Sequence, residues 1–145
     1  MTAIYLESSV VLAWLLGEPG SDWVRGVIDA ARLVHTSRLT FVEVERGLAR
    51  VLHGGRISEA EARRAKSLLT AAGHQWAVLA LSEPICARAG QTFPAEPVRA
   101  MDALHLASAL QAVGADADLR MLSFDDRVNR NAEALGIDTV QPPAD

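Results

Sequence analysis

The chain has 145 residues, of which 50% are hydrophobic and 22% are charged, with a formal net charge of −4 at pH 7. This size and apolar content are enough to bury a core, which excludes an intrinsically disordered chain. The single cysteine, Cys86, excludes an internal disulfide framework and a cysteine-rich zinc site. The negative net charge excludes a uniformly basic nucleic-acid coat protein.

The longest unbroken apolar run, residues 10–17, is too short to cross a bilayer. Glu7 precedes this run and no basic segment does, so a secretory leader is not expected. With one cysteine and no expected membrane segment, we expect a cytoplasmic protein.

Short apolar segments alternate with helical segments along the chain. Strands are predicted over residues 3–6, 33–36, 76–81, 119–123 and 138–140. Helices are predicted over residues 10–16, 21–31, 37–53, 58–72, from 82 onward, 101–113 and 125–135. This alternation predicts an α/β fold, a three-layer α/β/α arrangement around a short, mostly parallel sheet of four to five strands. No repeat or linker interrupts it, so residues 1–145 are expected to form a single domain.

Local signals refine these helices. Ser8 or Ser9 is predicted to cap the first helix, and Ser58 with Glu61 resembles a capping box. The helix over residues 101–113 is apolar nearly all round and is expected to be buried. Cys86 is interpreted as an inert core thiol.

Acidic residues fall where a parallel sheet would gather them. Glu7 directly follows the first predicted strand, and Asp125 and Asp126 follow the fourth. The carboxyl ends of parallel strands share one edge of the sheet, where ligands bind. Glu43 and Asp102 lie on helices that should pack near this edge. Clustered carboxylates repel one another unless a cation neutralises them, and an all-oxygen set suits Mg²⁺ or Mn²⁺.

Each of these residues also has a purely structural explanation. Asp102 and Asp125 could cap their own helices, and Asp126 is more typical of a solvated first-turn acid. Glu43 could pair with arginines on its own helix. Glu7 is the hardest to explain in this way, because an acid between a buried strand and an apolar helix needs a partner. His105 is more typical of a hydrogen-bonded core histidine than of a catalyst.

Four segments resemble one known family. They are Ile4–Ser9 (IYLESS), Ser37–Glu43 (SRLTFVE), Met101–Leu110 (MDALHLASAL) and Leu122–Asp125 (LSFD). Together, and in this order, they look like the PIN-domain nucleases, and more narrowly like the VapC-type toxins of bacterial toxin–antitoxin pairs. The similarity covers essentially the whole chain, and the segment around Asp102 is the most distinctive.

The resemblance implies a toxin that is a Mg²⁺- or Mn²⁺-dependent endoribonuclease. By motif position, the acidic quartet of the family falls on Glu7, Glu43, Asp102 and Asp125, as catalytic residues and metal ligands. Ser8 would support this site by hydrogen bonding. In such a site the ion activates a water for in-line attack on an RNA phosphodiester.

The resemblance also implies partners. One is a cognate antitoxin, for which apolar residues of the helices between residues 38 and 72 would form a docking groove. Another is a second copy of the chain, in a homodimer. The third is the RNA substrate, with Arg38, Arg46 and Arg50 of a locally basic stretch as candidate contacts.

One position departs from the family, since the first acid is usually Asp and is here Glu7. The extra methylene displaces the carboxylate, and functional sites tolerate only about half an ångström of misplacement. The alternative function is therefore a catalytically impaired PIN-like module that acts through antitoxin or RNA binding. A phosphoacceptor signalling domain fits less well, because it would need a lysine near the late strands and the only one is Lys66.

Overall fold

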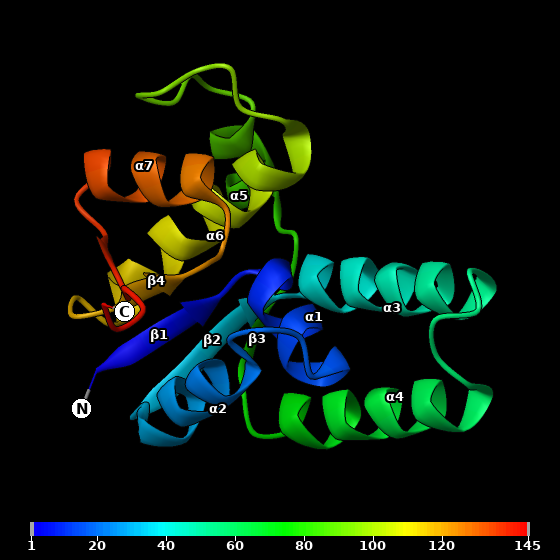
Figure 1. Cartoon of the computed structure of the whole chain (residues 1–145). Coiled ribbons are helices and arrows are strands. Elements are labelled where there is room, and N and C mark those ends of the chain that lie inside the picture. Colours follow the sequence, from blue (N-terminus) through cyan, green and yellow to red (C-terminus); the bar gives the residue numbers. More distant parts are fainter. Residues whose placement is uncertain (1, 145) are drawn as a thin grey trace.

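Five parallel strands form the sheet around which the helices of the chain are arranged (Figure 1). The computed structural model describes residues 2–144. The strands are β1 (Ala3–Leu6), β2 (Leu33–Ser37), β3 (Ala77–Leu79), β4 (Arg120–Leu122) and β5 (Asp138–Thr139). Their order is β3-β2-β1-β4-β5, so β1 is central and pairs with β2 on one side and β4 on the other. The predicted parallel sheet is confirmed, although β3 is shorter than the predicted residues 76–81.

Helices cover both faces of this sheet, as predicted. They are α1 (Ser8–Leu16), α2 (Ser21–Ala30), α3 (Arg38–His53), α4 (Glu59–Gly73), α5 (Glu83–Ala89), α6 (Ala100–Ala115) and α7 (Asp126–Ala134). In Figure 1, α5, α6 and α7 gather on one side of the strands and α1 to α4 on the other. Helices α3 and α4 run side by side and extend beyond the edge of the sheet.

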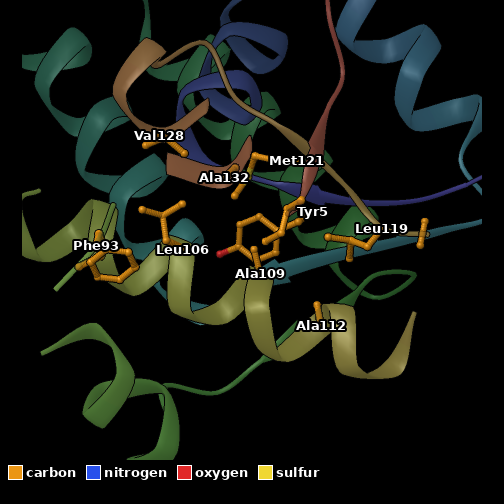
Figure 2. Packing of buried hydrophobic residues seen from close by; sticks show 12 residues of the cluster. Tyr5, Phe93, Leu106, Ala109, Ala112, Leu119, Met121, Val128 and Ala132 are labelled. Atoms are coloured by element: carbon orange, nitrogen blue, oxygen red, sulfur yellow. The ribbon is translucent and has the colours of Figure 1, made fainter. Parts of the chain in front are cut away.

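The alternating side chains of β1 feed two separate cores. Tyr5 packs with Leu106, Met121 and Val128 on the α6 and α7 side, as Figure 2 shows. Residues on the other face of β1 pack against helices α1 to α4, where Ile4 and Leu6 meet residues such as Val44. Because successive side chains of a strand point to opposite faces, a fully buried β1 anchors both helical layers at once. The loop that follows β1 is therefore held firmly in place.

Two local predictions are wrong. The cap of α1 is Glu7, whose side chain accepts a hydrogen bond from the backbone of Ser9, so neither Ser8 nor Ser9 caps this helix. A carboxylate at this position offers the backbone a charged acceptor, which binds more strongly than a hydroxyl. Cys86 is exposed rather than buried, because the seven-residue α5 buries only Ile85.

Within the described chain, no helix combines the length and the apolar character needed to span a membrane.

Candidate active site

The loops after β1 and β4 meet at the carboxyl edge of the sheet, where the sequence predicts the acidic site. The backbone N–H of Glu7 donates to the carbonyl of Leu122 across a distance of 3.1 Å, which holds the two strand ends together. This contact places the segment that begins α1 beside the segment that begins α7.

Glu7 is buried and surrounded by serine hydroxyls. Its side chain is 5% exposed. Oε1 accepts a hydrogen bond from Ser8 Oγ at 3.0 Å, and Oε2 accepts from Ser9 N at 3.1 Å and Ser123 Oγ at 2.9 Å. Ser9 Oγ also donates to Oε2. Three serine hydroxyls and one backbone amide thus supply the hydrogen bonds that this buried carboxylate needs.

Asp125 lies at the start of α7, where it acts as the helix cap. Its Oδ1 accepts from the backbone N–H groups of Arg127 and Val128, at 2.9 and 3.1 Å. Its own N–H donates to Ser123 Oγ at 3.0 Å. Ser123 therefore links the first acid, Glu7, to the last, Asp125, through one hydroxyl group.

Glu43 reaches the same region from α3. Its Oε1 lies 2.5 Å from His105 Nε2, and its side chain is 26% exposed. His105 is fully buried on α6, with Nδ1 2.9 Å from the hydroxyl of Tyr5. The interpretation of His105 as a hydrogen-bonded core histidine is confirmed.

Asp102 lies in the first turn of α6, where the other three predicted acids influence its pKa. Burial raises the pKa of its carboxyl, and the negative charges of Asp125, Glu7 and Glu43 raise it further, while His105 opposes them. Each like charge disfavours ionisation of a neighbour that is only partly exposed to water. The four predicted acids are therefore close enough to interact electrostatically.

Asp102 and Asp125 face a common cavity of about 360 Å³, which Asp126, Arg99 and Arg127 complete. Glu43 lines a second cavity of about 290 Å³ together with Ser8, Ser9, Arg46 and Arg50. Arg38 lies apart from both, with its guanidinium 5.2 Å from the centre of the Phe41 ring. Of the three candidate RNA contacts, two thus border a predicted acid and one does not.

The carboxylates are not gathered tightly around one point. Among residues 2–144, no three acidic, histidine or cysteine side chains lie in an arrangement that could hold a metal ion between them. Glu7 Oε2 is occupied by hydroxyl and amide donors, and Glu43 Oε1 by His105. Asp102 and Asp125, which line open space, are the acids best placed to accept a cation.

Sequence reasoning missed several participants. Ser9 and Ser123 donate to Glu7, and Arg99 and Arg127 line the cavity of Asp102 and Asp125. A signal was present for both arginines, because Arg99 precedes Asp102 by three positions and Arg127 follows Asp125 by two. The basic residues that the sequence analysis selected, Arg38, Arg46 and Arg50, all lie on α3 instead.

Comparison with known proteins identifies relatives across the whole chain. The model of the family described as PIN domain matches residues 4–134. Ribonuclease VapC46 of Mycobacterium tuberculosis (strain ATCC 25618 / H37Rv) is 33% identical over 142 residues, which cover 98% of this chain and 99% of that protein.

Solved structures share the fold. The crystal structure of Mycobacterium tuberculosis VapC20, described as a sarcin-ricin loop cleaving toxin, matches with a TM-score of 0.66 and 16% identity, over 96% of this chain and 99% of that one. A toxin–antitoxin complex from Klebsiella pneumoniae matches with a TM-score of 0.64 and 15% identity, over 94% of this chain and 96% of that one.

Proposed function

This chain belongs to the PIN-domain family, and from that premise we propose that it is the toxin of a toxin–antitoxin pair, an endoribonuclease that hydrolyses RNA phosphodiesters with a divalent cation. The whole-length similarity to a VapC ribonuclease supports the reaction class. The observation that carries the proposal is the gathering of acids at the carboxyl edge of the sheet, where Asp102 and Asp125 line one cavity and Ser123 links Asp125 to Glu7.

The donor set fits Mg²⁺ or Mn²⁺. These cations prefer oxygen ligands, and Mg²⁺ keeps several waters while binding through one or two carboxylates. Asp102 and Asp125 would hold the ion, since both line the open cavity and Asp125 uses Oδ1, but not Oδ2, to cap α7. A divalent cation supplies positive charge that activates a water and offsets the charge that builds up on the phosphate.

The other two acids act from the surroundings of this pair. Glu7 adds negative charge near Asp102. Its hydrogen bonds with Ser8 and Ser123 connect the ends of β1 and β4. Glu43 adds charge from α3 and is held in orientation by His105. In this assignment all four predicted acids serve the site, and two of them contact the cation.

A second function has one observation in its favour. Glu7, at the position where the family usually has Asp, is committed to hydrogen bonds with Ser8, Ser9 and Ser123. If cleavage also requires the first acid to contact the metal, a chain with Glu7 held in these hydrogen bonds would act through binding alone, as a catalytically impaired module. Divalent-dependent cleavage separates the two functions.

The proposed antitoxin would dock between α3 and α4. A cavity of about 240 Å³ opens between these helices and is lined by apolar residues that include Leu48, Leu52 and Ala62. An amphipathic helix or extended tail with apolar anchors suits such a groove. We also expect a homodimer, which light scattering on the purified chain will test.

The proposed activity is tested by incubating the purified chain with a pool of structured RNAs in Mg²⁺, in Mn²⁺ and in EDTA. We expect cleavage only with a divalent cation, and its loss by a factor of about a hundred or more in Asp102→Asn, because one member of the charged pair is removed. The matched control is Asp22→Asn, since Asp22 is 95% exposed on α2 and lines neither of the two cavities that contain the predicted acids. Equal cleavage by Asp102→Asn and wild type would overturn the assignment of the site.

A further inference from the structure

Two arginines share the acidic cavity, and nothing described so far gives them a function. Arg99 immediately precedes α6, and Arg127 lies in the first turn of α7. Both line the cavity of about 360 Å³ with Asp102, Asp125 and Asp126. The cavity therefore presents cationic and anionic side chains around one space.

Among residues 2–144, neither guanidinium forms an ion pair with an acid. Within the described part of the chain, no carboxylate oxygen lies within 4.0 Å of a guanidinium nitrogen of Arg99 or Arg127, although three aspartates line the same cavity. Both side chains belong to exposed residues. Most of their N–H donors are consequently available to a ligand.

The structure also ties the two arginines to each other. Arg127 Nη1 donates to the carbonyl of Pro97 at 3.1 Å, two residues before Arg99. This bond fastens the segment that carries Arg99 to the first turn of α7. The two segments that carry the arginines are thus held together beside the cavity, which limits the freedom that ligand binding would have to remove.

Resting on the proposed function, we infer that Arg99 and Arg127 bind a backbone phosphate of single-stranded RNA next to the bond that is cut. The planar guanidinium matches phosphate through paired N–H donors. Carboxylates alone would repel a polyanion, so a cavity that must admit RNA needs fixed positive charge beside them. The cavity volume lies within the range typical of small-ligand sites, roughly 300–1,000 Å³.

These two arginines are not the RNA contacts that the sequence predicted, which lie on α3. Arg46 and Arg50 border Glu43 in another cavity, and Arg38 lies over Phe41. Contacts along α3 would hold RNA beside Glu43, in that other cavity. Arg99 and Arg127 act at the cavity that contains the proposed ion-binding aspartates.

The test measures binding without cleavage. A fluorescent single-stranded RNA of mixed sequence is titrated in EDTA with wild type, Arg99→Ala/Arg127→Ala and Arg130→Ala, over a series of salt concentrations. Arg130 is the matched control, because it is an exposed arginine on α7 that does not line the cavity. Thermal unfolding of each variant verifies that it is folded.

We expect the double variant to bind about tenfold or more weakly and to lose roughly 0.7 from the magnitude of the slope of log K against log salt, which corresponds to one phosphate contact on a single strand. Arg130→Ala should match wild type. A merely structural role for Arg127 would weaken binding without this change in slope. Equal affinity and slope in the double variant and Arg130→Ala would overturn the inference, as would undetectable binding by wild type.

The same proteins separate this inference from the proposed activity. Cleavage by wild type in Mn²⁺ with an unchanged slope in the double variant leaves the nuclease intact and removes the arginine assignment. An arginine-dependent slope without cleavage by wild type supports the phosphate site and favours the impaired module.

Discussion

His105 Nε2 lies 2.5 Å from Glu43 Oε1 and joins the buried helix α6 to α3 at the acidic site. Nδ1 of the same ring lies 2.9 Å from the hydroxyl of Tyr5, so the imidazole bridges Tyr5 and Glu43. Burial raises the pKa of Tyr5, which keeps its proton in place. A continuous chain of side-chain contacts thus runs from β1 through α6 to α3.

We predict that His105→Ala destabilises the protein by about 2–4 kcal/mol, because it leaves a cavity and removes the partner of the buried Tyr5 hydroxyl. Urea denaturation measures this loss. His53→Ala, which alters an exposed histidine on α3, should change stability by no more than about 0.5 kcal/mol. Similar losses in the two variants would show that the Tyr5–His105–Glu43 contacts contribute little.

We predict that Asp102→Asn becomes more stable relative to wild type as the pH rises from 4 to 7 in EDTA. The pKa of Asp102 is raised in the folded state, so its contribution to stability is present below its unfolded pKa and is lost as the pH rises through the folded pKa. Asparagine does not ionise and escapes this loss. Thermal unfolding across this pH range checks the trend, and parallel curves for the two proteins would contradict it.

Adding Mn²⁺ at neutral pH should stabilise the wild type against unfolding more than it stabilises Asp102→Asn. A ligand that binds only the folded state stabilises it, and the wild type should bind the ion more tightly than Asp102→Asn. Asp22→Asn should respond to Mn²⁺ as the wild type does, since Asp22 is 95% exposed and outside the site.

A separate ion-pair cluster joins the segment of β2 to the end of α6. Asp116 Oδ2 lies 2.7 Å from His35 Nε2, and its Oδ1 accepts from Arg32 Nη2 at 2.9 Å. The bond from His35 and then that from Arg32 lower the pKa of Asp116. A lowered pKa gives stability that is present above the unfolded value, near 3.9, and is lost as the pH falls through the folded value.

We therefore predict that Asp116→Asn is less stable than wild type at pH 7 and that the difference shrinks below about pH 4. Denaturation at both pH values provides the comparison. Asp22→Asn, whose parent residue makes only a 3.5 Å contact with Arg25, should show no such difference at either pH. If the difference in stability between Asp116→Asn and wild type stays constant down to about pH 2, the lost stability comes from packing rather than from charge.

We predict that Glu7→Asp binds Mn²⁺ more tightly than wild type but unfolds more easily, by about 1 kcal/mol. The shorter side chain loses reach to the Ser123 hydroxyl, a hydrogen bond between residues 116 positions apart. The shorter side chain also moves the carboxylate away from the other serine hydroxyls that donate to Glu7. Calorimetry measures the metal affinity and urea denaturation the stability.

The variant Glu7→Gln serves as the control for this experiment, because it keeps the length and removes the charge. It should bind Mn²⁺ more weakly than either acid. Equal Mn²⁺ affinity in all three proteins would remove Glu7 from the site altogether.

The position of the candidate site could be predicted from the sequence because it follows from topology. Glu7 and Asp125 each follow a strand, and parallel strands bring their carboxyl ends to one edge. The local hydrogen bonds could not be predicted in the same way. The run Glu7-Ser8-Ser9 offers three side chains that can cap a helix, and only the backbone path shows that the first of them does so.

The walls of the cavity depend on still longer-range geometry. Arg99 and Arg127 meet there because the loop before α6 is bonded to α7, a contact that no periodic pattern encodes. The exposure of Cys86 has a simpler cause. An apolar run predicts burial only if the helix is long enough to offer a whole face to the core, and α5 has seven residues.

The pairing of β1 with β4 also sets when the site can exist during synthesis. Glu7 and Ser123 are 116 positions apart, so a ribosome adds the second roughly 6–23 seconds after the first. Until β4 emerges, β1 lacks one neighbour and the nascent chain lacks Asp125. The candidate site, in which Ser123 links Glu7 to Asp125, therefore forms only after β4 has been synthesised and has paired with β1.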